Sequence, residues 1–201
     1  MSSEPRPRRG VPAETRERLV ATAAEVFNRD GYDGTDSNRI AREAGYSPGT
    51  FYKHFPDKKA LFLAVYEEWV AKEWQSVGAL LTSDGSAEEV AARIVDVFLD
   101  HHARWRGFRA SLRALVPLDA DVRAFARTLR KKQLEALAHL SKTTRGGRST
   151  RSREEDALLL FSVERAADAV ADGEAEALGL RPRAFREALV ALIVRRMEPP
   201  A

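Results

Sequence analysis

The sequence contains no cysteine, which excludes a disulfide scaffold, a cysteine-ligated zinc finger and a thiol nucleophile. It also lacks an apolar run near the ~18 residues that a membrane-spanning helix requires. The first residues, Met1 to Arg6, have no apolar core of the kind found in signal peptides. We therefore expect a cytoplasmic protein without a membrane partner.

Strand-like alternation of β-branched residues is also absent, whereas alanine, leucine, glutamate and arginine dominate. These residues favour helices, so the pattern predicts an all-α fold. With 201 residues, 44% of them hydrophobic, the chain can form one large domain or a small module joined to a larger one. Glycine, proline and capping residues separate the predicted helices. The first begins near residue 13 and ends before Gly31, and the others span about 35–44, 48–54, 58–81, 87–104, 107–115, 119–143, 153–177 and 182–197.

The net charge is only +3, but arginine clusters in two segments. Three of the first nine residues are arginine, and four more lie within residues 145–153. Both clusters are typical of solvated segments. We therefore expect a flexible basic arm at residues 1–12. Because this arm precedes the first helix, it can lie along DNA and strengthen binding nonspecifically. The second cluster lacks the lysine-serine pattern of a phosphate-binding loop, so we assign it no nucleotide role.

The most informative segment is residues 35–55, where two short predicted helices flank a turn that contains Gly45. A turn of this length with a glycine lets helices pack at a steep angle, as in a helix-turn-helix motif. Ser47 followed by Pro48 is a helix-start signal, because the serine hydroxyl can accept an amide proton and proline fits the first helical position. The second helix of such a motif enters the major groove of DNA.

Helical periodicity divides the side chains of that second helix into two sets. Phe51 and Phe55 lie four residues apart and are predicted to face inward. The other side chains project elsewhere and are polar or aromatic: Thr50, Tyr52, Lys53 and His54.

The outward set suits DNA. Gly49 lets the helix approach the sugar-phosphate backbone, Tyr52 and His54 can donate hydrogen bonds to phosphate, and Lys53 can reach a base edge or a phosphate. Lys58 extends the cationic surface at the start of the next helix. In the structural alternative, Tyr52 and His54 only cover a small helical core.

The run from Thr15 to Val65 contains a set of short motifs: Thr-Arg-Glu-Arg-Leu at its start, Gly31-Tyr32, Arg39-Ile40-Ala41, Ala44 through Tyr52, Phe55, Lys58 and Leu61. With these motifs the run resembles the DNA-binding domain of the tetracycline-repressor (TetR) family. The resemblance implies an all-α homodimer with a helix-turn-helix domain, here residues 13–56, that binds a double-stranded DNA operator. It also implies that residues 57–201 bind a small-molecule effector and form the dimer.

The resemblance also implies DNA contacts at particular positions. Ser37 departs from the family pattern, because it stands where an apolar residue is usual and so removes some core from the supporting helix. Lys59 stands where an acid is common, which forgoes a favourable interaction with the helix dipole. The implied DNA-binding residues are Thr35, Asn38, Arg39, Ser47, Pro48, Gly49, Thr50, Tyr52, Lys53, His54 and Lys58.

Large aromatic residues gather in the carboxy-terminal part of the chain. Such residues usually form plain core, but the resemblance favours an effector pocket. His101 and His102 diverge by about 100° on a helix, so we expect only one of them to face inward as a polar anchor. Since no further ligand has supporting spacing, we expect neither a metal nor a cofactor. The candidate effector-binding residues are Tyr66, Val70, Trp74, Phe98, His102, Trp105, Phe108 and Phe125.

The last two predicted helices carry apolar stripes in which small residues permit close helix approach. The resemblance implies that two copies of these helices form an intersubunit four-helix bundle. Packing within one subunit is the competing use of the same stripes. The candidate interface residues are Leu159, Val163, Ala166, Val170, Phe185, Leu189, Leu192 and Ile193.

The sequence contains no nucleophile elbow, dinucleotide fingerprint, metalloprotease helix or kinase signature, so an enzyme is not favoured. The sequence favours a one-component transcriptional regulator that represses a promoter and is released by an effector of unknown identity. Two alternatives stay open. One is a helical protein-interaction module without specific DNA binding, which the weakened supporting helix allows, and the other is an enzyme.

Overall fold

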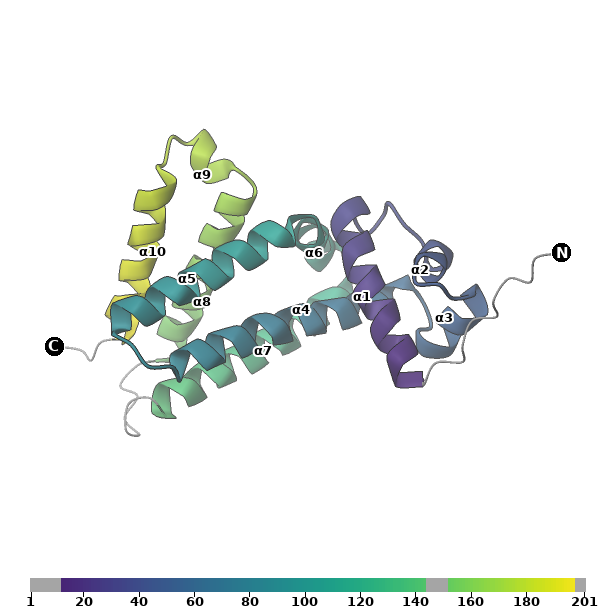
Figure 1. Ribbon diagram of the computed structural model, residues 1–201, viewed down its shortest axis with the longest axis horizontal. Coiled ribbons are helices and arrows are strands. Elements are labelled where there is room, and N and C mark those ends of the chain that lie inside the picture. The colour runs from purple at the N-terminus through teal and green to yellow at the C-terminus, as the bar shows by residue number, and fades with distance from the viewer. Residues whose placement is uncertain (1–11, 144–151, 198–201) are drawn as a thin grey trace. The chain divides into compact units, whose positions relative to one another are not determined.

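The computed structural model describes residues 12–143 and 152–197, and this part of the chain contains helices and no strand (Figure 1). The all-α prediction is therefore confirmed. The chain divides into two compact units between Tyr66 and Glu67. None of the described helices combines the length and apolar character needed to cross a bilayer. The predicted basic arm up to residue 11 and the segment 144–151 lie outside the described residues.

The helix bounds agree with most of the predicted ones. Helices α4, α7 and α10 match the predicted bounds to within a residue, and the start of α8 does as well. The helices are α1 (Pro12–Asp30), α2 (Ser37–Glu43), α3 (Pro48–His54), α4 (Lys58–Leu81), α5 (Ala87–Arg104), α6 (Arg106–Leu118), α7 (Ala120–Thr143), α8 (Arg153–Ala171), α9 (Glu174–Ala177) and α10 (Pro182–Met197).

The amino-terminal unit contains α1, α2, α3 and the first turns of α4 around one apolar core. The ring of Phe27 stacks on Tyr32 at 5.9 Å between centroids and meets Phe62 edge-on at 5.1 Å. Because residues of α4 complete this core, the unit extends to Tyr66 and not only to the predicted boundary at residue 56. The buried core residues are Leu19, Val20, Ala23, Val26, Phe27, Ile40, Ala41, Ala44, Phe51, Phe55, Leu61, Phe62 and Val65.

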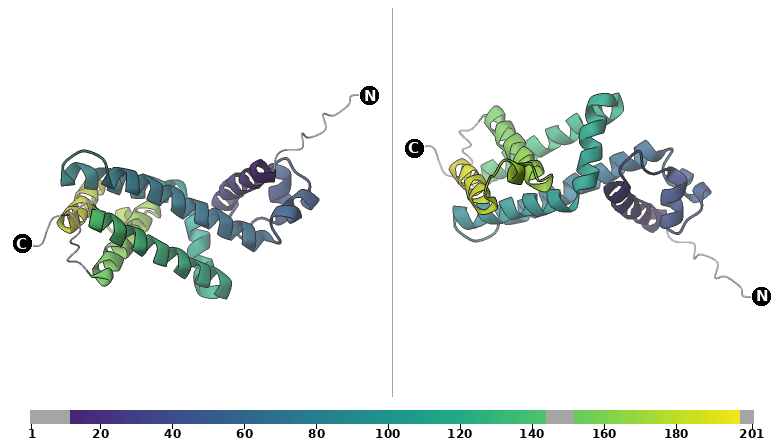
Figure 2. Two further views of the ribbon diagram at one scale, coloured as in Figure 1. Left: turned by 90° about the horizontal axis from the view of Figure 1, so that it is seen from below. Right: turned by 90° about the horizontal axis from the view of Figure 1, so that it is seen from above.

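The carboxy-terminal unit is organised around α5. This helix packs against α8 and α10, which also pack against each other, while α7 packs against α6 and α8 (Figures 1 and 2). Ser86 and Ser152 begin α5 and α8, each as part of a capping box with the glutamate three residues later. The apolar core of this unit contains Val77, Val90, Ala91, Ile94, Val95, Phe98, Leu160, Val163, Ala167, Leu189 and Ile193.

Two predicted helix ends are wrong. The sequence predicts an end near residue 115, before Pro117, but α6 continues to Leu118. The proline lies in the last turn, and its carbonyl oxygen accepts a hydrogen bond from Arg123 Nη1 at 2.9 Å, which replaces part of the lost helical bonding. The predicted helix 153–177 is interrupted at Gly173, whose left-handed φ of 77° ends α8 before the short α9 begins.

Candidate functional site

Local capping fixes the turn between α2 and α3. The backbone N–H groups of Gly45 and Tyr46 donate to carbonyl groups in the last turn of α2 at 3.0 and 2.9 Å, and the φ of Gly45 is 82°. This Schellman pattern needs a residue that tolerates the left-handed region. Ser47 Oγ then accepts the Thr50 N–H at 3.2 Å, with Pro48 in the first position of α3. The predicted helix start and the helix-turn-helix motif are both confirmed.

The start of α2 is also stabilised, although Ser37 is a polar residue in a buried position. Asp36 caps the helix by accepting the Arg39 N–H at 2.9 Å. Ile40 and Ala41 bury the apolar face of α2 completely. The supporting helix therefore keeps a capped start and an apolar contact surface despite the serine.

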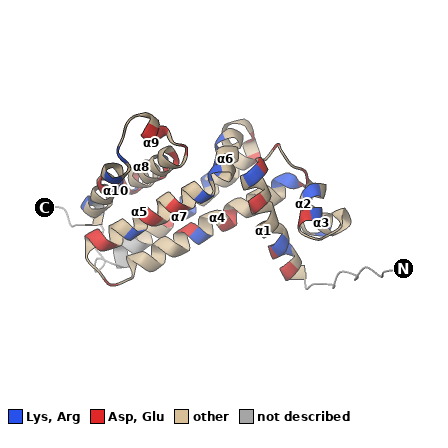
Figure 3. Cartoon of the chain, turned by 45° about the horizontal axis from the view of Figure 1, so that its top comes forward, with Lys and Arg blue, Asp and Glu red and all other residues tan. Residues whose placement is uncertain are grey.

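The side chains of α3 divide as predicted. Phe51 and Phe55 are buried, with 6.0 Å between their ring centroids. Lys53 is a basic residue in the last turn of α3. Figure 3 marks all lysine and arginine residues of the described chain in blue. The outer face presents hydroxyl, ammonium and imidazole groups. The exposed residues of this face are Ser47, Pro48, Gly49, Tyr52 and Lys53, and Thr50 and His54 are half-buried.

An ion-pair network joins α2 to the end of α1. Arg39 Nη2 lies 2.7 Å from Asp30 Oδ2, Nε donates to Glu43 at 3.0 Å, and Nη1 donates to the Gly34 carbonyl at 3.1 Å. Arg29 binds the same two carboxylates, and its hydrogen bonds lower the pKa of Asp30. Because all three nitrogens of Arg39 are engaged, the geometry favours a positioning role over a direct DNA contact for this residue.

Lys58 holds the loop that precedes α2. Its ammonium donates to the carbonyl oxygens of Tyr32 at 2.7 Å and Thr35 at 2.9 Å, and it lies 4.0 Å from the Tyr32 ring centroid. Thr35 is buried, whereas Asn38 is exposed. The structure thus brings Asn38, Tyr52 and Lys58 together around an open, polar pocket of about 300 Å³, which Asp36, Ser37 and Arg42 complete.

The family model described as "Bacterial regulatory proteins, tetR family" matches residues 19–65, which include the motif and most of its supporting core. The amino-terminal domain belongs to the TetR family. A curated relative of this chain is the HTH-type transcriptional repressor AcnR of Corynebacterium efficiens, which is 26% identical over 113 residues, or 56% of each protein. The chain spans between 20% and 56% of the length of the curated relatives that it matches first.

Solved structures extend the similarity of fold to the carboxy-terminal domain. A protein assigned to the TetR family of transcriptional regulators from Rhodococcus sp. superposes with a TM-score of 0.73 and 19% identity, over 92% of this chain and all of that one. A transcriptional regulator from Saccharomonospora viridis, solved in complex with choline, gives a TM-score of 0.70 and 22% identity over 90% of this chain and 96% of that one. At these identities the likeness shows the fold.

In the carboxy-terminal domain, the structure groups several predicted effector residues around Trp69. The ring centroid of Trp69 lies 5.6 Å from that of His102 and 6.4 Å from that of Phe108, and Phe98 lies 6.1 Å from His102. Val70 is also buried. Trp74, Trp105 and Phe125 are half-buried, and Tyr66 is the last residue of the amino-terminal unit.

Both histidines reach the same buried carboxylate. His101 Nδ1 lies 3.0 Å and His102 Nε2 lies 3.4 Å from Glu73 Oε2, and His102 Nδ1 lies 2.9 Å from Asp168 Oδ1. The prediction that only one histidine faces the interior is therefore wrong. The two side chains diverge from the helix axis, but Glu73 lies where both rings can reach it.

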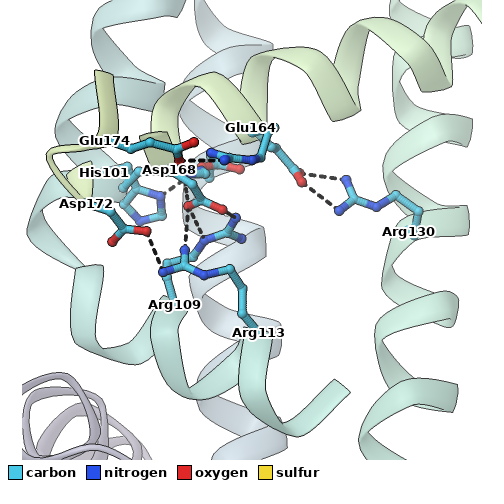
Figure 4. Close-up of polar contacts among 11 residues, drawn as sticks. His101, Arg109, Arg113, Arg130, Glu164, Asp168, Asp172 and Glu174 are labelled. Atoms are coloured by element: carbon cyan, nitrogen blue, oxygen red, sulfur yellow. Dashed lines mark hydrogen bonds and ion pairs between the residues drawn. The ribbon is translucent and has the colours of Figure 1, made fainter. Parts of the chain in front are cut away.

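Asp168 is the centre of this polar cluster (Figure 4). It accepts hydrogen bonds from Arg109 Nε at 3.1 Å and Nη2 at 2.7 Å, and Arg113 Nη1 lies 3.2 Å away. Arg113 also donates to Asp172 at 2.7 Å. Burial alone would raise the pKa of Asp168, but hydrogen bonds from His102 and Arg109 hold it well below its usual range.

The same balance of burial and partners sets the other pKa values in the cluster. Burial disfavours the charged form of His102, but the Asp168 and Glu73 carboxylates raise its pKa above the usual value. Burial would likewise raise the pKa of Glu73, but the two imidazoles lower it. Within residues 12–143 and 152–197, no group of three or more His, Asp or Glu side chains is arranged to hold a metal ion.

The aromatic pattern of the sequence included Trp69, but sequence reasoning missed Glu73, Arg109 and Asp168 as members of this site. A signal was present at Glu73, which lies four residues after Trp69 and four before Val77 on the buried face of α4. A charged residue within an apolar stripe is unusual unless it is paired inside the fold.

The predicted dimer residues fall into three groups by their exposure. Val163, Leu189 and Ile193 belong to the domain's own apolar core, because the stripes that carry them face α5 and each other. These three residues are thus corrections to the predicted interface set. Leu192 is exposed, and so are Leu158 and Phe161 of α8, which the prediction left out. The remaining predicted residues are half-buried: Leu159, Ala166, Val170 and Phe185.

Proposed function

We propose that this protein is a one-component transcriptional repressor that binds a near-palindromic DNA operator as a homodimer and is released by a small-molecule effector. The observation that carries the proposal is the outer face of α3, which presents polar donors above a fixed apolar core. The match of residues 19–65 to the TetR family supports the same function. A DNA partner implies that the protein acts in the cytoplasm.

The proposed DNA contacts use the hydrogen-bond donors of α3 and of the pocket beside it. Lys53 reaches a base edge or phosphate, and Tyr52 and His54 donate to phosphate oxygens, which fix the register of the helix in the groove. Gly49 has no side chain, so the backbone can approach the DNA closely. Ser47, Pro48, Thr50, Thr35, Asn38 and Lys58 complete the proposed surface, and Arg39 positions it.

Exposed apolar side chains support the proposed homodimer. Leu158 and Phe161 lie three residues apart on α8, where they share one side of the helix, and Leu192 is exposed on α10. Burying such residues against a second copy removes apolar surface from water. Two reading domains related by two-fold symmetry then require half-sites spaced by about one helical turn of DNA, roughly 34 Å.

The buried aromatic and polar cluster around Trp69 is the proposed effector site. The choline found with the Saccharomonospora viridis regulator supports a small-molecule ligand in a protein of this fold. Helix α4 is continuous from Lys58 to Leu81, so it carries Val65 of the DNA-binding domain core and Glu73 of the polar cluster. We propose that movement of this helix on effector binding changes the position of the reading domain.

The test begins with selection of bound duplexes from genomic fragments by the purified full-length chain. Affinity for a selected duplex is then measured by fluorescence anisotropy at several salt concentrations. Tyr52→Phe removes one hydrogen bond to phosphate and should weaken binding about five- to tenfold. If Lys53 binds phosphate, Lys53→Ala should also reduce the slope of log affinity against log salt concentration by about one, which corresponds to the loss of one phosphate contact.

The matched control is Lys72→Ala, which removes an exposed lysine of α4 that pairs with Glu68 at 3.3 Å. This variant should bind the operator like the parent. Failure to select any specific duplex would instead favour the helical protein-interaction module. If both α3 variants bind a selected duplex as tightly as the control, the proposed reading face is wrong.

A further inference from the structure

Helix α4 buries three polar atoms that have no hydrogen-bond partner among the described residues; one is Trp74 Nε1, and the other two belong to the polar cluster. These two are Trp69 Nε1, an N–H donor, and Glu73 Oε1, a carboxylate acceptor. Both side chains are buried, and His102 Nε2 beside them lies 3.4 Å from Glu73 Oε2 without forming a hydrogen bond of good geometry. Unpaired buried polar groups are costly and therefore rare in folded proteins. Such a pair within one cluster indicates a site for a bound polar group.

The donor and the acceptor belong to one site. Trp69 and Glu73 are one helical turn apart, so their side chains leave α4 on the same side. His101 connects them, since its ring stacks on Trp69 at 4.6 Å with a 13° interplanar angle while its Nδ1 reaches Glu73 Oε2 at 3.0 Å. Phe98 and Phe108 are also buried beside this cluster and add an apolar surface.

We infer that this site binds the polar end of the effector, and that the effector is an uncharged, largely apolar compound carrying a hydroxyl or a primary amide. The inference rests on the proposed function and names the chemistry of its effector. A hydroxyl or amide both donates and accepts hydrogen bonds, so it can donate to Glu73 Oε1 and accept from the Trp69 indole. An ammonium has no lone pair for the indole, and a carboxylate has no proton for Glu73.

The charge balance of the cluster favours the same class of ligand. Asp168 is paired with the Arg109 guanidinium, and His102 lies between Asp168 and Glu73. The raised pKa of His102 favours its imidazolium form, so the cluster itself contains two negative groups, Glu73 and Asp168, and two positive groups, His102 and Arg109. The nearby Arg113 is paired with Asp172. A charged ligand would therefore add a buried charge without a counter-ion, which is strongly unfavourable.

The experiment uses four probes with the same ring: benzyl alcohol, benzamide, benzylamine and benzoate. Each is titrated into the full-length protein at neutral pH while the indole N–H signals are followed by ¹⁵N nuclear magnetic resonance. The chain has three tryptophans, so the loss of one signal in Trp69→Phe assigns the reporter. Benzyl alcohol and benzamide should bind saturably in the millimolar range and shift the Trp69 signal, as expected for ligands of this size.

The charged probes should bind at least about tenfold more weakly than the alcohol, a ratio that corresponds to loss of one buried hydrogen bond. Glu73→Gln and Trp69→Phe should each weaken the binding of benzyl alcohol by a similar factor, and for Trp69→Phe, which lacks the reporter indole, binding is followed through the ¹H signals of the probe itself. The control is Glu68→Gln, which changes a partly exposed carboxylate on the same helix and should bind benzyl alcohol like the parent. The Trp69 variant keeps the test valid if Glu73→Gln does not fold.

Three results would overturn the inference: equal or tighter binding of benzylamine or benzoate, no saturable binding of any probe, or alcohol binding that neither variant weakens. Because the titrations contain no DNA, their result is obtained separately from the test of operator binding. A protein that binds its operator but rejects the neutral probes contradicts this inference alone. A protein that binds the neutral probes but selects no operator contradicts the proposed function alone.

Discussion

Replacement of Asp168 by asparagine is the sharpest test of the polar cluster in the carboxy-terminal domain. Asp168→Asn keeps the shape of the side chain but removes its charge. In the parent protein this carboxylate binds His102 at 2.9 Å and Arg109 through two hydrogen bonds of 3.1 and 2.7 Å. The variant removes the carboxylate that pairs directly with the guanidinium of Arg109 inside the domain, which is strongly destabilising.

Burial decides the size of the effect. The side chains of Asp168 and Arg109 are only 9% and 11% exposed, and removing one partner of a buried ion pair costs about 3–5 kcal/mol. The matched control is Asp172→Asn, because Asp172 pairs with Arg113 nearby but these side chains are 35% and 40% exposed. An exposed pair contributes less than about 1 kcal/mol. The two variants make the same chemical change, so the difference between them measures the burial of Asp168 together with its additional partners, His102 and Arg109.

The assay is urea unfolding followed by circular dichroism at neutral pH, with the protein concentration held constant because the proposed dimerisation would shift apparent stability. Asp168→Asn should lower the free energy of unfolding by at least about 2 kcal/mol more than Asp172→Asn, with similar slopes. If the two variants unfold at the same urea concentration, the cluster does not stabilise the domain in the way its geometry indicates.

Two further predictions concern pH and backbone strain. Since the pKa of His102 is raised on folding, its charged form stabilises the protein fully below the unfolded value of about 6.5, and this contribution is lost as the pH rises through the folded value. The difference in thermal stability between the parent and His102→Gln should therefore shrink at alkaline pH, and a constant difference contradicts the proposed charge. Gly45→Ala should cost about 1–2 kcal/mol because the φ of this residue is 82°. Gly49→Ala, which meets only Ser47 Oγ at 3.9 Å, should change stability by less than about 0.5 kcal/mol; equal melting temperatures for the two alanine variants would refute the strain argument.

The helix-turn-helix could be predicted because its signals are local. Gly45 permits the left-handed end of α2, Ser47 caps α3, and the spacing of Phe51 and Phe55 selects the buried face. Each of these signals acts within a few residues of the chain. The family resemblance added expected DNA contacts, Arg39 among them. It could not predict that three neighbouring groups bind the Arg39 guanidinium, because these contacts form only in the folded chain.

The polar cluster could not be predicted in the same way, because its members are far apart in sequence. His102 and Asp168 are separated by 66 residues and belong to α5 and α8. Periodicity indicates which side of a helix is apolar, but it does not indicate which helix packs against that side. Because periodicity does not identify the packing partner of a helix, Val163 and Leu189 were expected at a subunit interface, whereas they lie in the core of the domain.

Helix α8 connects the polar cluster to the proposed dimer surface. Asp168 belongs to the cluster, and Glu164, one turn earlier, forms two hydrogen bonds of 2.6 Å with Arg130 of α7. The same guanidinium lies 5.2 Å from the ring centroid of the exposed Phe161. A ligand that alters the contacts of Asp168 therefore acts on a helix whose next turns carry the apolar side chains proposed to meet a second subunit. Because a helix moves largely as a rigid element, effector binding and dimer geometry are expected to change together.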